Sequence, residues 1–280
     1  MRRNKAEGVL IFITMIWGVG FPLTSIALKN GIGPYTLVSI KSFVATLVLA
    51  VIFKNKFKLI NLKMIAAGSL VALALVVGNI FQTLGMVYTT PSKSSFITGL
   101  SVVFVPILMI IIYRKRPKLR LALGALTAVI GLFFLTYNGD AGVNIGDILT
   151  ILCAFSYSFQ ILLVDKTGKA YDGITLAIVE LFMVGVFSLI PAFMLEGYRI
   201  SSSSSVVVCV LITGIFGSGV GMAVQNKMQP MINPSHAAII YLFEPVFGVV
   251  FSSFIGDVLS PRAFIGCILI FLAMFISREG

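Results

Sequence analysis

Long apolar runs alternate with short polar stretches along the whole chain, and this pattern predicts its elements. A helix needs about 20 apolar residues to cross the hydrocarbon core of a bilayer. Ten runs approach that length, which predicts an all-α membrane protein with ten transmembrane helices. The predicted runs are 8–28, 34–53, 64–88, 91–113, 119–137, 145–164, 173–195, 206–227, 233–255 and 261–277.

The boundaries of several runs carry helix-start signals. Thr90-Pro91, Asn233-Pro234 and Ser260-Pro261 each place a capping residue before a proline at the first helical position. The stretch 196–205, with five consecutive serines, is polar and predicts a loop outside the membrane. Pro22, Pro106 and Pro245 fall inside runs, where proline can kink a helix.

The composition excludes an ordinary soluble protein. Of the 280 residues, 58% are hydrophobic and only 11% are charged, whereas about 25% of residues are charged in typical soluble domains. The net charge of +11 comes from short clusters between apolar runs, which favours anionic lipid and not nucleic acid as the partner. Three scattered cysteines and one histidine give no metal-binding spacing, and we expect no metal and no cofactor.

The Lys and Arg residues also predict the orientation. Ten crossings place both termini on one side, and sixteen of the 21 basic residues then fall on that side, four on the other and Lys41 within a run. Basic loops remain cytoplasmic in membrane proteins. We therefore expect a multi-pass protein of the plasma membrane with both termini in the cytoplasm.

The two halves of the chain resemble each other. When the second half is laid along the first, Gln82 falls on Gln225 and Pro91-Ser92 on Pro234-Ser235, and a slightly smaller offset brings Thr36-Leu37 onto Thr175-Leu176. We call this match the repeat alignment. It predicts two five-helix units, 1–138 and 139–280. Because five is odd, the second unit enters the membrane from the opposite side. Inverted repeats of this kind are typical of transporters, with the substrate site at the midplane between the halves.

Three charged residues stand out within the runs, where a charge is costly. They are Lys41, Glu180 and Glu244. Glu244 is placed near the midplane, either as a proton or amine site or as a structural carboxylate hydrogen-bonded near Pro245. Lys41 and Glu180 differ in predicted depth by about 10 Å, which disfavours a direct ion pair. His236, at the start of the ninth run, is expected to have a surface or capping role.

Polar residues in the runs supply the rest of a candidate cavity. Amides within a span either line a pore or tie helices together, and aromatic side chains with a polar edge can form its walls. Gly214, Gly217, Ser218 and Gly221 have the spacing of closely packed helices. The candidate cavity residues are Trp17, Asn79, Gln82, Thr98, Tyr157, Gln160, Gln225, Tyr241 and Glu244.

Enzyme chemistry has little support in the sequence. An intramembrane protease needs a serine and a histidine, and the only pair available is Ser218 with His236. A prenyltransferase needs clustered aspartates to hold magnesium and diphosphate, but the five aspartates are scattered. We therefore expect a protein that is not an enzyme. The sequence also lacks a nucleotide-binding motif.

Several motifs resemble the EamA family of the drug/metabolite transporter superfamily. The stretch Trp17-Gly18 with Phe21 is similar to its first-helix signature, and Phe96 through Leu100 with Val105-Pro106 to its fourth helix. Residues 234–238 and Glu244-Pro245-Val246 are similar to its ninth-helix motif. The likeness covers nearly the whole chain. This family commonly has Arg in place of Lys41 and Gly-Glu in place of Gly256-Asp257.

The resemblance implies a ten-helix transporter with a central cavity. Helices one, three, four, six, eight and nine would line it, the fifth and tenth would lie outside, and Lys41 and Glu180 would have gating or structural roles. Members carry amino acids, other metabolites or drugs, often outward. We therefore expect alternating-access export of an amino acid or related compound by a monomer or homodimer. Uptake or exchange of a nucleoside, sugar or organic acid, or a non-transporting scaffold or receptor, are the alternatives.

Overall fold

The structure, a computed structural model, describes residues 2–114, 117–136, 143–198, 203–254 and 260–278. All regular elements in these ranges are helical. The α-helices are α1 (Arg2–Lys29), α2 (Pro34–Ile52), α3 (Leu62–Tyr88), α4 (Pro91–Gly99), α5 (Ser101–Tyr113), α6 (Leu119–Thr136), α7 (Ile145–Thr167), α8 (Gly173–Glu196), α9 (Ser204–Ile212), α10 (Gly221–Met228), α11 (Pro234–Tyr241), α12 (Phe243–Phe254) and α13 (Pro261–Ser277). The others are the 3-10 helices η1 (Lys54–Leu59) and η3 (Gln229–Met231) and the π-helix η2 (Thr213–Val220).

Every predicted run contains at least one of these helices, but three runs are divided. The fourth run consists of α4 and α5, the eighth of α9, η2 and α10, and the ninth of α11 and α12. Part of the predicted loop at 196–205 is helical, because α9 begins at Ser204. Residues 199–202 of that loop, and the Gly256-Asp257 departure, lie outside the described residues.

Length and apolarity support a multi-pass membrane protein. Within the described ranges, seven helical segments are long and apolar enough to cross a bilayer, and α6 and α13 are shorter apolar helices. The exact number of ten crossings stays a prediction. The seven segments are Arg3–Lys29, Pro34–Ile52, Leu62–Tyr88, Lys93–Tyr113, Ile145–Thr167, Gly173–Glu196 and Ser204–Met231.

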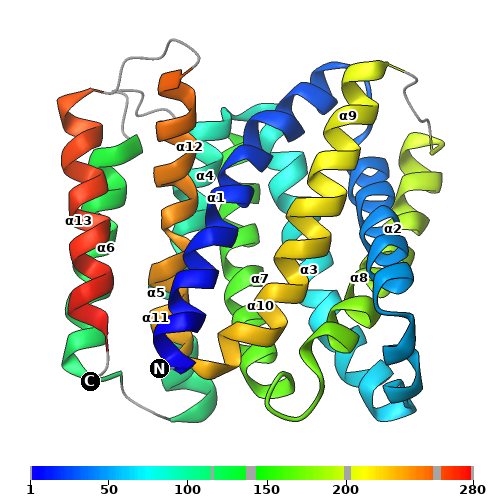
Figure 1. The fold of residues 1–280 in the computed structure, drawn as a ribbon. Helices are drawn as coiled ribbons and strands as arrows, with labels where there is room; N and C mark the ends of the chain where they lie inside the picture. Colours follow the sequence, from blue (N-terminus) through cyan, green and yellow to red (C-terminus); the bar gives the residue numbers. More distant parts are fainter. Residues whose placement is uncertain (1, 115–116, 137–142, 199–202, 255–259, 279–280) are drawn as a thin grey trace.

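The capping signals at the proline-containing boundaries are formed as predicted. The Thr90 side chain accepts from the Lys93 N–H, the Asn233 side chain from Ser235 and the Ser260 side chain from Ala263. These contacts satisfy amide groups that have no partner within the helix. Pro22 lies inside α1, which Figure 1 shows bent in its second half. A proline removes one helical hydrogen bond and crowds the preceding turn, which accounts for the bend.

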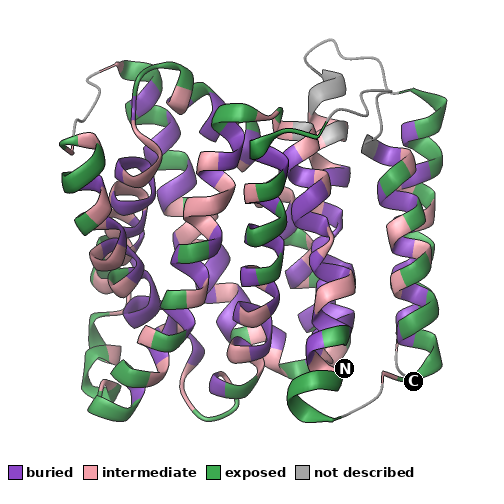
Figure 2. Ribbon diagram, turned by 180° about the vertical axis from the view of Figure 1, so that it is seen from behind, coloured by how far each residue is buried: buried purple, intermediate pink, exposed green. Residues whose placement is uncertain are grey.

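The helices pack in a few preferred pairs. The closest are α6 with α13, α3 with α7 and α2 with α8, while α1 packs along α12 and along the segment from α9 to α10. The α6 and α13 pair lies at one edge of the molecule, beside the rest (Figures 1 and 2). The helix α1 begins and α13 ends at the same end of the molecule (Figure 1), which we call the terminal end.

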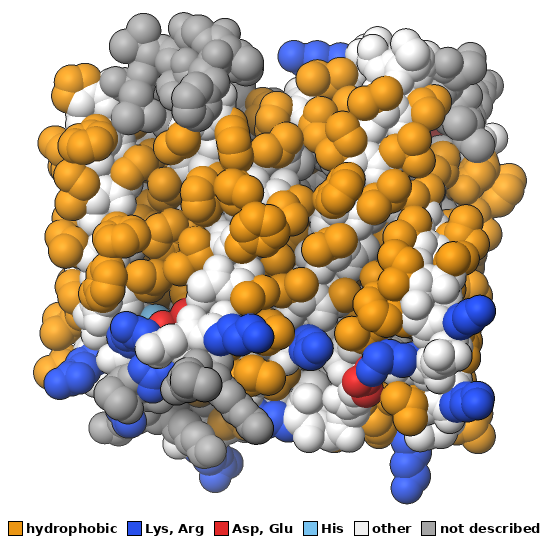
Figure 3. All heavy atoms as spheres, in the orientation of Figure 1, with side chains coloured by type: hydrophobic (Ala, Val, Ile, Leu, Met, Phe, Trp, Pro, Cys, Tyr) orange, Lys and Arg blue, Asp and Glu red, His pale blue; other side chains and the backbone are white. Residues whose placement is uncertain are grey.

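The surface has the distribution expected for a bilayer. Figure 3 shows a broad band of hydrophobic side chains across the visible face of the molecule, with most of the visible Lys and Arg side chains near the terminal end. Large apolar residues in the chain are exposed, such as Leu62 at 84% and Met194 at 78%. An exposed apolar surface of this extent is stable only against lipid.

Carboxylates fasten both ends of the α2 and α8 pair. At the terminal end, Asp172 accepts from the N–H and hydroxyl of Thr175 at 3.0 and 2.8 Å, and its other oxygen pairs with Lys56 at 2.7 Å. At the opposite end, Glu196 accepts from the N–H groups of Tyr35 and Thr36 at 3.0 and 2.8 Å. An anion at a helix N-terminus is favoured by unpaired N–H groups and by the helix dipole.

Candidate substrate cavity

A cavity of about 160 Å³ lies among the helices. Its volume is roughly ten times what one buried water molecule needs, so it can hold a small organic molecule. The nine candidate cavity residues all line it: Trp17 from α1, Asn79 and Gln82 from α3, Thr98 from α4, Tyr157 and Gln160 from α7, Gln225 from α10, Tyr241 from α11 and Glu244 from α12. Whether these side chains bind a substrate stays a prediction.

The cavity extends away from the terminal end. In α1 and α3, which begin at that end, the lining residues come from the second half of each helix, Ile16 to Thr24 and Leu75 to Met86. In α4, which begins at the opposite end, they are Ser95, Thr98 and Gly99. The cavity therefore occupies the middle of the molecule and the half remote from the termini.

One wall is a chain of hydrogen bonds. Lys41 Nζ donates to Asn79 Oδ1 at 3.2 Å, and the Tyr157 hydroxyl is 3.3 Å from both Asn79 Oδ1 and Gln82 Oε1. Gln82 Nε2 donates to Thr98 Oγ1 at 3.3 Å. These distances are at the long end of the normal range. We call these five residues the wall; a bound ligand can replace such weak contacts at low cost.

The side nearest the terminal end is closed by a tighter set of amides, which we call the floor. Gln225 Nε2 donates to Gln160 Oε1 at 3.2 Å and to Gln229 Oε1 at 3.0 Å. The Tyr241 hydroxyl donates to the same Gln229 oxygen at 2.9 Å. Gln229 Nε2 in turn donates to the Ile161 carbonyl oxygen at 2.7 Å. These four polar side chains link α7, α10, η3 and α11.

Glu180 lies behind the floor and outside the cavity lining. Its side chain is fully buried, and its two oxygens accept from Gln160 Nε2 at 3.2 Å and from Asn226 Nδ2 at 2.5 Å. A buried carboxylate requires such donors. Because Gln160 contacts both Glu180 and Gln225, the carboxylate is connected to the floor through one side chain. Among the described residues, no ion pair joins Glu180 to Lys41, as the difference in predicted depth indicated.

Glu244 and Lys41 both face the cavity and are not paired with each other. Lys41 has the Asn79 side chain as its hydrogen-bond partner, and the structure shows no hydrogen bond or ion pair to the Glu244 carboxylate within the described residues. The interpretation of Glu244 as a hydrogen-bonded structural carboxylate therefore has no support. The break between α11 and α12 at Leu242 places Glu244 in the first turn of α12, where helix N–H groups favour an anion.

Two aromatic residues occupy equivalent places against glycines. A Cβ atom added to Gly78 would collide with the ring of Tyr157, and one added to Gly221 would collide with the indole of Trp17. The two glycines fall on each other in the repeat alignment, and Trp17 and Tyr157 come from α1 and α7, the first helix of each half. Trp17 also donates to the Gly217 carbonyl oxygen at 2.9 Å and meets the edge of the Tyr241 ring.

Of the glycines with the predicted close-packing spacing, Gly214 of η2 allows close helix contact, whereas no atom of the described residues lies within 4 Å of a Cβ built on Gly217. A Cβ on Gly214 would lie 3.0 Å from the Lys41 carbonyl oxygen in α2. The same segment is π-helical, which the sequence did not predict, and it contributes Gly217 and Ser218 to the cavity. Wide turns of this type often occur at functional sites.

Two expectations need correction. Lys41 of α2 and Leu181 of α8 line the cavity, although the resemblance did not include the second and seventh helices among those that line it. His236 is not a surface residue, since it is only 3% exposed and its Nδ1 contacts Ser277 Oγ at 2.8 Å. It does not pair with Ser218. The sequence analysis also missed Gln229 and Asn226; Gln229 lies one helical turn after Gln225, and that spacing was an available signal.

Comparisons with known proteins agree with this architecture. The sequence model of the EamA-like transporter family matches residues 5–137 and 144–278. The chain is 31% identical to an "Uncharacterized transporter" of Archaeoglobus fulgidus, covering 99% of this chain and 86% of that protein. It is 23% identical to the "Uncharacterized transporter YvbV" of Bacillus subtilis, over 96% of this chain and 90% of that protein.

A solved structure described as "Crystal structure of protein" shares the fold, with a TM-score of 0.78, 14% sequence identity and coverage of 98% of this chain and 96% of that chain. The family match spans nearly all of the sequence in two adjoining stretches. The chain therefore belongs to the EamA-like transporter family.

Proposed function

We propose that this membrane transporter moves a small organic metabolite that carries both an amino and a carboxyl group, an amino acid or a related compound. The observation that carries the proposal is the presence of Lys41 and Glu244 in one cavity without an ion pair between them. A zwitterionic ligand supplies a partner for each charge. The rings of Trp17, Tyr157 and Tyr241 provide apolar surface beside these charges.

Alternating access between two inverted halves is the mechanism we propose, with the units at 1–138 and 139–280. The family match in two stretches supports this division. The helix pairs support it too, because contacts in one half have equivalents in the other. The contact of α3 with α7 is equivalent to that of α10 with α1, since α3 corresponds to α10 and α7 to α1. The contact of α1 with α12 is likewise equivalent to that of α7 with α4 and α5. All of these pairs are in contact. Such symmetry lets the two halves exchange conformations around a central site.

The orientation and direction are part of the proposal. The gathering of Lys and Arg at the terminal end (Figure 3) supports ten crossings with cytoplasmic termini in the plasma membrane. The floor then separates the cavity from the cytoplasm, and the structure represents the state whose site faces outward. Export is the direction that the family resemblance implies, and no enzyme activity is proposed.

Flux measurements in proteoliposomes test the proposal. The full chain would be reconstituted and uptake of radiolabelled amino acids, nucleosides, sugars and organic acids compared, with and without a pH gradient. We expect saturable flux of a zwitterionic amino acid, reduced at least tenfold by Glu244→Gln and by Lys41→Met, because each variant leaves one charge of the ligand without its partner. Leu126→Gln, an exposed position on α6, is the control for a polar change away from the cavity.

Two outcomes decide against parts of this proposal. Transport of a neutral nucleoside or sugar that is unaffected by both charge variants would overturn the substrate class and keep the transporter. Equal leakage from protein-containing and empty vesicles for every compound, with folded protein verified by its circular dichroism, would favour a receptor or scaffold.

A further inference from the structure

Gln160 of the floor bridges two buried groups that lie on other helices. Its Nε2 is 3.2 Å from Glu180 Oε1 and 3.4 Å from Gln225 Oε1, and its Oε1 accepts from Gln225 Nε2 at 3.2 Å. One neutral side chain therefore satisfies a buried carboxylate of α8 and a buried amide of α10 at the same time. Buried polar groups require such partners, and here the protein itself supplies them.

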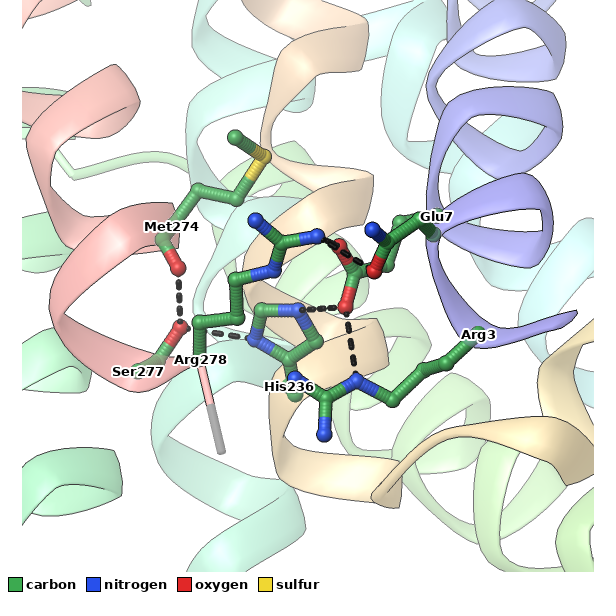
Figure 4. Close-up of polar contacts among 7 residues, drawn as sticks. Arg3, Glu7, His236, Met274, Ser277 and Arg278 are labelled. Carbon is green, nitrogen blue, oxygen red and sulfur yellow. Dashed lines mark hydrogen bonds and ion pairs between the residues drawn. The ribbon is translucent and has the colours of Figure 1, made fainter. Parts of the chain in front are cut away.

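The terminal side is also held together farther from the cavity. Glu7 Oε1 is 3.2 Å from Arg3 Nε and 3.4 Å from His236 Nε2, and Glu7 Oε2 is 3.0 Å from Arg278 Nη2. Figure 4 shows these contacts, which join α1, the first turn of α11 and the residue after α13. The floor and this second layer both consist of side chains of the protein, so closure of the terminal side does not depend on a ligand.

The repeat alignment places a glycine where the floor has Gln160. Trp17 and Tyr157 occupy equivalent places in the two halves, as their contacts with glycines show. Gly20 follows Trp17 by three residues, and Gln160 follows Tyr157 by three residues. Residues that are three apart lie on the same face of a helix. Gly20 therefore has the place in the first half that Gln160 has in the second.

The two groups that Gln160 bridges have equivalents that line the cavity. Gln225 falls on Gln82 in the repeat alignment, and the smaller offset brings Glu180 onto Lys41. When two inverted halves exchange conformations, closure of the opposite side brings these equivalents together. The bridging position then holds a glycine without a side chain, and the charge beside it is a cation in place of a carboxylate.

Gly20 leaves open space at this position. Within the described part of the chain, no atom lies within 4 Å of a Cβ built on Gly20, and the residue lines the cavity together with Lys41 and Gln82. Lys41 Nζ donates to Asn79 Oδ1 at 3.2 Å, and Gln82 Nε2 donates to Thr98 Oγ1 at 3.3 Å. An ammonium group has three donors, and its strongest partners are anions. A group that bridges Lys41 and Gln82 should therefore accept hydrogen bonds and carry a negative charge.

We propose that the carboxylate of the transported molecule binds in the space at Gly20, where it accepts hydrogen bonds from Lys41 Nζ and Gln82 Nε2. This site rests on the proposed transport of a compound with a carboxyl group. The bound carboxylate forms the bridge that Gln160 forms in the floor, and it completes closure of the opposite side. Substrate-free protein therefore stays in the conformation with a closed floor, and binding of the substrate permits the exchange.

Gly20→Gln tests the site because it supplies the bridging amide from the protein. The matched control is Gly217→Gln, the same change at a second glycine that lines the cavity and has no described atom within 4 Å of a built Cβ. Gly217 falls on Ala74 in the repeat alignment, so its glutamine has no equivalent in the floor. Both variants and wild type would be studied as the full chain in lipid nanodiscs, with folding verified by circular dichroism.

Hydrogen–deuterium exchange without substrate measures opening on each side. Peptides from 221–231 report on the floor, and peptides from 82–99 report on the opposite side. We expect Gly20→Gln to slow exchange in 82–99 and to accelerate it in 221–231 by about fivefold, the effect of one net hydrogen bond. Gly217→Gln should lack this shift. A wild-type exchange pattern in Gly20→Gln would overturn the proposal, as would the same shift in both variants.

Competition against transport separates this site from the proposed function as a whole. The wild type would be assayed with the radiolabelled amino acid that it transports, and unlabelled competitors would carry either the carboxylate or a carboxamide in its place. Loss of the carboxylate should weaken competition by about tenfold in wild type and have little effect in Gly20→Gln, whose added amide occupies the same place.

The outcomes are distinguishable. Amino acid transport by wild type with equal competition by carboxylate and carboxamide would overturn the site and leave the transport function intact. An equal preference for the carboxylate in wild type and Gly20→Gln would also overturn the site, because the carboxylate would then bind elsewhere. Absence of flux for every amino acid would overturn the proposed substrate class, and the carboxylate site with it.

Discussion

The wall and the floor of the cavity contain equivalent residues in different states. Gln82 in the wall and Gln225 in the floor fall on each other in the repeat alignment. Gln82 is partly exposed to the cavity and has contacts of 3.3 Å. Gln225 is 3% exposed, and its amide is bonded to Gln160 and Gln229. The aromatic and glycine contacts, in contrast, are alike in the two halves.

This comparison distinguishes contacts that depend on helix packing from contacts that depend on the conformation of the transporter. Contacts between a glycine and an aromatic ring occur in both halves of the molecule because they set the distance between the packed helices. The amides differ because Gln225 belongs to the closely bonded floor, whereas Gln82 borders the cavity. In an alternating-access transporter the two sets of amides would exchange these roles, so that Gln82 would become bonded when Gln225 is released.

The largest effect is expected from removing the floor amide. Gln225→Leu leaves the buried Gln160 Oε1 without its donor and removes one of the two donors to Gln229 Oε1, which costs about 1–3 kcal/mol. Gln82→Leu, the matched variant in the wall, should cost less than about 0.5 kcal/mol, because its groups and their partners can reach cavity water. Thermal unfolding in nanodiscs measures both. Equal losses would mean that wall and floor are equally ordered, which would contradict the comparison.

A smaller and more symmetric effect is expected at the two glycines. Gly78→Ala and Gly221→Ala each push a methyl group into an aromatic ring, at a net cost of about 1–2 kcal/mol after the gain in helix propensity. Adding Tyr157→Ala to the first variant and Trp17→Ala to the second should restore part of the loss, since the ring is then absent. Comparable losses at both sites in thermal unfolding would sharpen the view that packing follows the repeat; a loss at one site only would break it.

The smallest effect on stability is expected from Asp172, at the terminal end of the α2 and α8 pair. Partial burial raises the pKa of Asp172, but hydrogen bonds from Lys56 and Thr175 outweigh it and hold the pKa below its usual value. A lowered folded-state pKa gives stability that is present above the unfolded value of about 3.9 and is lost as the pH falls through the folded value. Because the side chain is 34% exposed, the pair contributes at most about 0.5 kcal/mol.

Asp172→Asn is the variant that isolates this charge. Asparagine still caps α8 but cannot pair with Lys56, so stability should become less dependent on pH below about pH 5, while Asp172→Ala should lose the cap as well. Melting midpoints between pH 3 and 7 in high and low salt measure the difference. An unchanged acid response in Asp172→Asn would show that other carboxylates, such as Glu196 at the opposite end, dominate it.

The helices and their starts could be predicted because the responsible interactions are local. A run of about 20 apolar residues has few alternatives to a membrane helix, since backbone groups in lipid must bond within the segment. Thr90, Asn233 and Ser260 cap amides only two or three residues away. The cavity residues were found for a related reason: a polar side chain in an apolar run needs a polar environment.

The breaks within helices were harder to predict. The sequence pointed to Pro106 as a kink, yet Pro106 lies inside α5 and the interruption is at Leu100. In the eighth run, the wide turns of η2 coincide with glycines that approach Lys41 and Trp17. Such distortions depend on which helix lies opposite, and periodicity along one segment of sequence contains no information about that neighbour.

The sequence by itself determined the class of the protein, the helices and the polar residues buried among them. Tertiary structure decided the partners: Lys41 with Asn79, Glu180 with Gln160 and Asn226, and His236 with Glu7 and Ser277. The reason is physical. An apolar helix surrounded by lipid and protein has no polar face to reveal its orientation, and the charge that a buried residue meets comes from a helix distant in the sequence, as Glu7 of α1 is from His236 of α11.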